Sequence, residues 1–121
     1  MAEEQAWTTE FYQTEDGESP VDEFLRSLDD TTQARFIWSI EQLQVLNIRA
    51  REPLVKHLEG KLWELRRSSD GNIYRLLYFF FTGCKIVFLH GFQKKSQKTP
   101  CREIETAQAR MDDYIRRRGS G

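Results

Sequence analysis

Cationic and aromatic side chains are interleaved in the second half of the sequence, where together they could bind a phosphate-rich ligand. The window from Gly71 to Arg102 contains six lysine and arginine residues and no aspartate or glutamate. Cations beside aromatic rings are typical of surfaces that hold nucleic-acid phosphates and stack bases. The candidate residues are Arg66, Arg67, Tyr74, Arg75, Tyr78, His90, Phe92, Lys94, Lys95 and Lys98.

The charge of the chain is unevenly distributed, although the net charge is only −1. Residues 1–30 hold ten acidic residues and a single basic one, Arg26. The acidic excess therefore lies outside the cationic window. This asymmetry favours an anionic ligand for the basic part. The alternative is an ordinary solvated surface on which charges are unevenly spread.

Conventional catalytic and metal-binding motifs are absent from the sequence. It contains no GxGxxG, no GxxxxGK[ST], no HExxH, and no serine or cysteine in a recognisable nucleophile setting. Cys84 and Cys101 match no metal-ligand spacing. We expect them to be reduced thiols of a cytoplasmic protein, with a disulfide between them as the alternative. We expect no metal and no cofactor.

Length and composition predict one domain over residues 1–121, with a core from about residue 8 to residue 117 and a flexible tail at 119–121. Hydrophobic residues make up 39% of the chain, which is enough for a core. The longest apolar run, Leu76 to Phe81, is too short to cross a bilayer. The first residues lack the basic-then-apolar pattern of a signal peptide.

Two turn signals, at residues 69–72 and 82–84, separate three short runs that are rich in β-branched and aromatic residues. This pattern predicts an antiparallel meander, with a helix over residues 76–81 as its main competitor. Residues 7–13 are expected to form an earlier strand. The segment from Asn47 to Gly60, which contains Pro53, is expected to be a packed connection without a strand of its own.

Three helices are expected around this sheet. Ser19 and Pro20 begin the first, and its apolar face recurs at helical spacing. The second runs from about residue 32 to residue 46, and the last from about Thr99 to Arg117. The order β-α-α-β-β-β-α predicts an α+β fold with a small antiparallel sheet of four strands, an N-terminal helical hairpin and a C-terminal helix. The second helix is expected to bury Phe36, Ile37, Ile40 and Leu43.

Strand alternation places Arg75 among apolar neighbours in the middle of a strand. It either forms an ion pair with Glu64 of the neighbouring strand or holds a phosphate through its guanidinium, and Glu64 can orient it for that purpose. His90 is expected on the face of Ile86 and Phe88, where a satisfied core histidine is the alternative to a functional one.

Three lysines, Lys94, Lys95 and Lys98, follow the last strand directly and precede the last helix. They would bring ammonium groups and the free N–H groups of a helix N-terminus close together. A solvated loop is the alternative.

Four segments carry a family resemblance: LWELR (62–66), IYRLLYF (73–79), FLHGFQKKSQKTP (88–100) and EIETAQAR (103–110). They resemble the RelE/ParE toxin superfamily, and within it the HigB-like, phage-derived branch. The resemblance spans roughly residues 8 to 117 and implies the toxin of a type II toxin–antitoxin system. RelE and HigB members of that superfamily are ribosome-dependent mRNA endonucleases, or mRNA interferases, which inhibit translation. The implied partners are a helix-turn-helix antitoxin, the ribosome and mRNA.

An endoribonuclease of this kind lets the RNA 2′-OH attack the phosphate, so the protein needs only to move protons and stabilise charge. We assign Arg75 and Arg66 to the scissile phosphate. Lys94 and Lys95 are assigned as general base and acid, in an order that the sequence leaves open, if crowded cations lower their pKa values. The RNA-binding candidates are Arg67, Tyr74, Tyr78, His90, Phe92 and Lys98, with the aromatic rings as stacking surfaces.

Two functions from other classes remain open. One is a ParE-like inhibitor of DNA gyrase, and the other is a non-catalytic, phage-derived RNA- or protein-binding module. RelE-like nucleases are strongly basic, whereas the isoelectric point here is about 6.1. The acidic excess that causes this difference is confined to residues 1–30. The retained arginines and lysines favour the nuclease.

Overall fold

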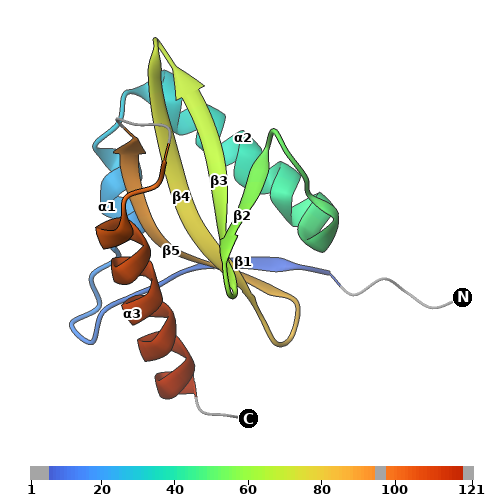
Figure 1. The fold of residues 1–121 in the computed structure, drawn as a ribbon, viewed down its shortest axis with the longest axis vertical. Coiled ribbons are helices and arrows are strands. Elements are labelled where there is room, and N and C mark those ends of the chain that lie inside the picture. The colour runs from blue at the N-terminus through green and yellow to red at the C-terminus, as the bar shows by residue number, and fades with distance from the viewer. Residues whose placement is uncertain (1–5, 95–97, 119–121) are drawn as a thin grey trace, which may run out of the picture.

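The computed structural model describes residues 6–94 and 98–118 and shows an α+β protein, which confirms the expected fold class. In this part of the chain, three α-helices surround a five-stranded mixed sheet (Figure 1). The elements are β1 (Thr8–Phe11), α1 (Pro20–Arg26), α2 (Asp30–Leu46), a 3-10 turn (Asn47–Arg49), β2 (Val55–Glu59), β3 (Leu62–Ser69), β4 (Asn72–Phe81), β5 (Lys85–Lys94) and α3 (Cys101–Arg118).

The strands are ordered β1-β5-β4-β3-β2 across the sheet. Strands β2 to β5 pair antiparallel in chain order, so the expected meander is confirmed and residues 73–80 are strand. The turn between β3 and β4 uses the left-handed region at Asp70 and Gly71, with φ of 51° and 79°. Strand β1 pairs in parallel with β5, which makes the sheet mixed.

Strand β2 is a fifth strand that the sequence did not predict. Its residues were expected to form a connection without a strand, yet they pair with β3 from Val55 to Glu59. Val55 is buried, whereas Lys56, His57 and Glu59 are exposed. A short edge strand of this kind buries too few side chains to show clear alternation, so its composition resembles that of a loop.

The two faces of the sheet are covered by different helices. Helices α1 and α2 lie on one face and α3 on the other (Figure 1). On the first face, Phe36 and Leu43 of α2 belong to one apolar cluster with Tyr78 of β4. On the second face, Met111 of α3 belongs to another cluster with Leu77 of β4. Each face therefore has its own apolar cluster, as expected for an α+β layer arrangement.

Side chains cap the two N-terminal helices as their sequences require. The N–H of Asp22 donates to Ser19 Oγ at 3.4 Å, which confirms Ser19 as the cap of α1. The N–H of Thr32 donates to Asp29 Oδ1 at 2.7 Å, so α2 begins two residues earlier than expected. The prediction that Ile37 is buried is wrong, since it is 53% exposed on the outer side of α2.

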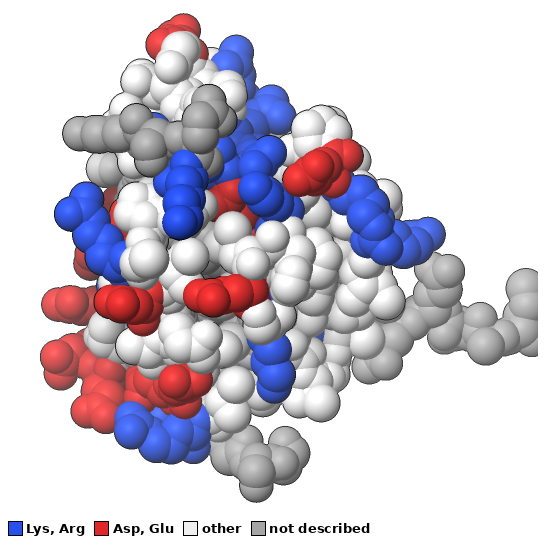
Figure 2. Space-filling model, viewed as in Figure 1, with Lys and Arg blue, Asp and Glu red and all other residues white. Residues whose placement is uncertain are grey.

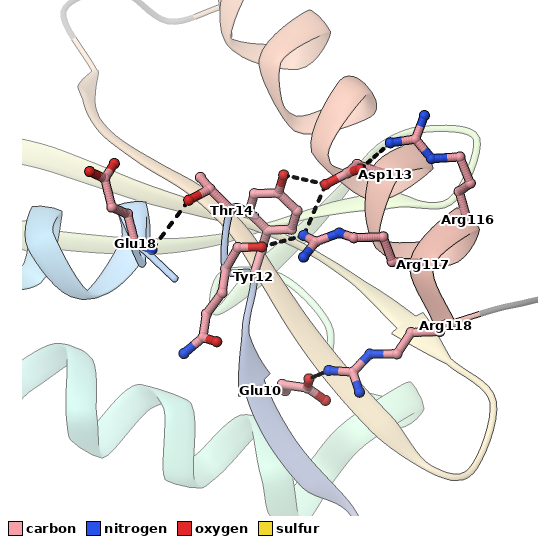
Figure 3. A network of polar contacts seen from close by, with 9 residues as sticks. Glu10, Tyr12, Thr14, Glu18, Asp113, Arg116, Arg117 and Arg118 are labelled. Carbon is pink, nitrogen blue, oxygen red and sulfur yellow. Dashed lines mark hydrogen bonds and ion pairs between the residues drawn. The ribbon is translucent and has the colours of Figure 1, made fainter. Parts of the chain in front are cut away.

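A polar network fastens the end of α3 to β1 and the residues after it (Figure 3). Tyr12 Oη donates to Asp113 Oδ2 at 2.6 Å, and Arg117 pairs with the same carboxylate at 2.9 Å. Arg118 forms an ion pair with Glu10 and lies over the ring of Tyr114. The contacts of Tyr12 with Asp113 and of Glu10 with Arg118 join residues 101 and 108 positions apart, and they hold α3 along the sheet.

Both cysteines are free, so the alternative of a disulfide between them is not realised. Cys84 is half-buried beside the β4–β5 turn, and Cys101 is exposed at the first residue of α3. None of the described helices is long and apolar enough to cross a membrane.

Gly91 in β5 lets α1 approach the sheet closely. A Cβ atom there would lie 2.4 Å from Phe24 Cδ2 and 2.8 Å from Leu76 Cδ2, well inside van der Waals contact. We expect Gly91→Ala to lower the free energy of unfolding by about 1–3 kcal/mol because it overpacks this contact. Urea denaturation measures the effect. In a Phe24→Ala background the loss should shrink markedly, and an unchanged loss would show that the contact is not its cause.

Candidate functional site

A polar cluster lies on the α3 face of the sheet, beyond the N-terminal end of that helix. The strand register places Arg66 opposite Arg75, and Ile73 opposite Lys94, so all four share this face. Lys56 of β2 lies opposite Glu64 on the same face. Figure 2 shows lysine and arginine side chains gathered in the upper part of this face, and acidic ones gathered lower down on the left.

Glu64 is the centre of the cluster. It is fully buried, and its carboxylate accepts hydrogen bonds from three side chains. Arg75 Nη1 and Arg66 Nε bind Oε1, the latter at 3.2 Å, and Thr99 Oγ1 donates to Oε2 at 2.6 Å. The carboxylate therefore fixes two guanidinium groups and ties the chain just before α3 to the sheet. The ion pair between Arg75 and Glu64, which the sequence left as one of two interpretations, is present.

Lys94 is the least compensated charge of the cluster. It is only 7% exposed, and it has no hydrogen-bond or ion-pair partner in the described part of the chain. Burial, and to a smaller extent the positive charges of Arg75, Arg66 and Lys56, together lower the pKa of Lys94 to about 8. Roughly a tenth of the molecules then carry a neutral amine here at pH 7. The group can both attract an anion and release a proton near physiological pH.

A cavity of about 470 Å³ opens beside the two guanidinium groups. The Nε atom of Arg75 is buried and has no hydrogen-bond partner in the described structure, so donor capacity remains after Glu64 is satisfied. A buried donor without a partner is costly, so this N–H group is available to a water molecule or a ligand in the cavity. The cavity is lined by Pro53, Arg66, Arg67, Ser68, Ile73 and Arg75.

His90 is held by α3 through both ring nitrogens. Glu103 Oε1 lies 3.0 Å from Nε2, and Arg110 Nη1 lies 3.1 Å from Nδ1. Burial lowers the pKa of His90, an effect that Glu103 opposes and Arg110 reinforces. A neutral ring fits these partners in one tautomer, with Nε2–H donating to Glu103 and Nδ1 accepting from Arg110. The ring also stacks on Phe92, with centroids 5.5 Å apart.

The position of His90 corrects the expectation that it shares a face with Ile86 and Phe88. The register between β4 and β5 shifts between Leu77 and Tyr78, where β5 gains one residue. A bulge of this kind interrupts alternation, so the side chains that follow it change faces. His90 consequently lies on the α3 side, the same side as Arg75.

Several residues predicted for RNA binding do not join the cluster. Tyr74 and Tyr78 are buried on the other face, under α1 and α2, and Tyr78 is fully enclosed. Arg67 also lies on that side, with its guanidinium 5.6 Å from the centre of the Trp38 ring. Lys98 is exposed immediately before Thr99. Lys95 lies outside the described residues.

Sequence reasoning missed two members of the cluster, Thr99 and Lys56. Thr99 was considered only as a helix-capping residue, and the strand that carries Lys56 was not predicted. The alternation of β2 against β3, once paired, is the signal that would have found Lys56. Within the described residues no group of three or more His, Cys, Asp and Glu side chains could hold a metal ion.

The charge on Lys94 should cost the protein stability. Because its pKa in the folded state is below that of an unfolded lysine, the unfolded chain binds the extra proton, and stability rises with pH between about 8 and 10.5. We expect Lys94→Met to raise the free energy of unfolding at pH 7 by on the order of 2 kcal/mol, with the gain fading toward pH 10.5. Urea denaturation at several pH values measures this. Exposed Lys61, changed to Met, is the control, and an equal gain there would contradict the assignment.

Comparison with known proteins assigns the chain to a family. Residues 23–112, well over half of the chain, match the family described as Phage derived protein Gp49-like (DUF891). The match includes Glu64, Arg66, Arg75 and Lys94 of the cluster and most of α3. No curated protein matches the chain. The chain therefore belongs to the Gp49-like family of phage-derived proteins, which is known as a family of type II toxin–antitoxin toxins related to RelE and ParE.

Proposed function

We propose that this toxin is a HigB-like endoribonuclease that cleaves mRNA on the ribosome without a metal ion. The observation that carries the proposal is the buried ammonium of Lys94, which lacks an acidic partner in the described structure and lies beside two arginines. Lys94 lies opposite Ile73, which lines the cavity beside the two arginines, and a phosphate bound there would supply the missing negative charge. RNA supplies its own nucleophile, so the site needs only phosphate binding and proton transfer.

Arg75 and Arg66 bind the scissile phosphate in this proposal. Their guanidinium groups are already oriented by Glu64, and Arg75 retains a free Nε donor. During cleavage the phosphate gains negative charge as the 2′-oxygen bonds to phosphorus and the 5′-oxygen leaves. Donors that are fixed before the reaction stabilise this charge without reorganisation. Glu64 itself acts as a positioning residue, because its carboxylate binds Arg66, Arg75 and Thr99 of the protein.

Lys94 is the proposed general base. Its neutral amine accepts the proton of the 2′-OH while the oxygen attacks phosphorus, and a second group protonates the departing 5′-oxygen. A lysine with a pKa of about 8 is near the optimum for this role at neutral pH. We retain Lys95 as the candidate acid from the sequence. Lys98, exposed at the same end of the sheet, is proposed to bind a flanking phosphate.

The stacked pair of His90 and Phe92 borders the cluster and offers a ring surface for a base. His90 is half-buried and its position is fixed by α3, so it can present one face without losing its hydrogen bonds. In this proposal the protein meets its substrate in the ribosome, acts in the cytoplasm as a single domain, and is neutralised by a protein antitoxin.

A matched pair of neighbouring arginines tests the site. Arg66 faces the cluster, whereas Arg67 faces Trp38 on the other side of the sheet. We expect Arg66→Gln to slow reporter mRNA cleavage in a purified translation system by about 10²-fold or more, since one charge-stabilising donor is lost. Arg67 also lines the cavity, but its guanidinium lies over Trp38, so Arg67→Gln should retain cleavage within a few-fold. Equal losses in both variants would contradict the proposed face.

The same assay, run with EDTA and beside a gyrase supercoiling assay, distinguishes the functions. Inhibition of supercoiling without mRNA cleavage would replace the nuclease by a ParE-like inhibitor. EDTA is added with magnesium in excess, so that the ribosomes keep their magnesium while other metal ions are chelated. Loss of cleavage under these conditions would overturn the metal-free mechanism.

The pH dependence tests Lys94 as the base. Because the pKa of Lys94 in the free protein is about 8, kcat/KM for cleavage should rise about tenfold per pH unit below 8 and level off above it. Single-turnover kinetics on programmed ribosomes between pH 6 and pH 9 measures this. Lys94→Gln should lower the rate and flatten the profile. A slope that persists in the variant would assign the titrating group elsewhere.

A further inference from the structure

Helix α2 is apolar on two sides, and one of them is uncovered. Phe36, Ile40 and Leu43 pack against the sheet, as the core requires. On the outer side, however, Ile37, Trp38 and Val45 are 53%, 52% and 66% exposed, and Ile48 follows just beyond the helix at 58%. A helix that is apolar all round is normally buried, and a continuous exposed apolar stripe marks an interaction surface.

Trp38 stands at the edge of a second cavity, of about 480 Å³. The Arg67 guanidinium lies over its ring, and Arg67 Nε is buried without a hydrogen-bond partner in the described structure. Arg35 donates hydrogen bonds to Ser68 O at 3.3 Å and to Ser69 Oγ at 3.2 Å. An exposed tryptophan flanked by arginines is the composition of a binding hot spot. The cavity is lined by Asp30, Thr31, Ala34, Arg35, Trp38 and Arg67.

The charges beside the stripe indicate the chemistry of the occupant. Neither Arg35 nor Arg67 makes an ion pair with a carboxylate in the part of the chain that the structure describes. Arg49 and Arg51 add positive charge beyond the C-terminal end of α2, while Glu41 is the acid within the stripe. Carboxylates on a partner would pair with these guanidinium groups bidentately.

We infer that the outer side of α2 binds an amphipathic, acidic helix of a partner protein, with Trp38 as the central anchor. A helix of 17 residues is roughly 25 Å long, enough for a second helix to pack along the stripe. A second copy of the chain is the less favourable occupant. Two-fold pairing through this stripe would place its arginines beside those of the other copy.

This docking surface and the phosphate-binding cluster lie on opposite sides of the sheet, one on the outer side of α2 and the other beside α3 (Figure 1). A partner on α2 leaves the cluster uncovered. Partner binding and RNA cleavage are therefore separable by mutation. Only the identification of the partner as the antitoxin rests on the proposed function, since the surface itself follows from exposure and charge.

The test uses the full chain and the product of the reading frame that adjoins its gene, with affinity measured by calorimetry. Trp38→Gln/Val45→Gln should weaken binding roughly 30-fold or more, as expected for loss of a hot-spot residue. Arg35→Glu should weaken it in a salt-dependent way. Glu105 is an exposed residue of α3, so Glu105→Gln is the control and should bind like the wild type. Hydrogen exchange should show new protection over residues 31–49.

Several results would overturn the inference. The first is that the double variant binds the partner with wild-type affinity, and the second is that hydrogen-exchange protection is confined to β3–β5 and α3. The third is that the wild type does not bind the product of the adjoining reading frame. The fourth is that the isolated wild-type chain forms a homodimer and the double variant is monomeric. Circular dichroism and thermal unfolding establish that each variant is folded. The mRNA cleavage assay is run in parallel. A chain without nuclease activity that still loses its partner through Trp38 would refute the proposed function and leave the docking surface standing.

Discussion

The site depends on one carboxylate, Glu64, buried in a sheet among cations. Burying a charge is expensive unless it is paired and hydrogen-bonded, and Arg75, Arg66 and Thr99 together satisfy this requirement. The pairing need not add net stability, because the desolvation of Glu64 and Arg75 offsets much of their attraction. Its structural effect is geometric. It fixes two guanidinium groups on adjacent strands and connects them, through Thr99, to the segment that leads into α3.

The charges of this cluster do not balance, and the imbalance is what makes it a candidate site. One carboxylate cannot neutralise both arginines and Lys94 as well. Burial and the neighbouring arginines therefore lower the pKa of Lys94 to about 8 instead of providing it with a partner. A protein that keeps a buried cation in this state loses stability that a phosphate ligand would return. The position of α3 matters for the same reason, because its Glu103 and Arg110 fix His90 beside the cluster.

The sequence predicted those features that local patterns determine. Turn residues and β-branched runs located the meander, Ser19 located the start of α1, and alternation placed Arg75 within reach of Glu64. What it could not predict depends on pairing partners. Strand β2 buries little beyond Val55, so it became recognisable only against β3. The predicted face of His90 was wrong because a bulge in β5 interrupts the alternation of side chains. Ile37 was assigned to the core because α2 carries apolar residues on both sides, and periodicity alone cannot say which side is covered.

The two faces of the sheet carry different polar groups, and alternation of side chains along each strand separates them. In β3 the neighbouring residues Arg66 and Arg67 point to opposite faces, one to Glu64 and the other to Trp38. The same strand thus carries one guanidinium in the cluster around Glu64 and another on the half-apolar surface around Trp38. Arg66 shares the single carboxylate of Glu64 with Arg75, and Arg67 forms no ion pair with a carboxylate in the described part of the chain. A low net charge is therefore compatible with two separate, locally positive surfaces, because a ligand interacts with the local charge on one face of the sheet.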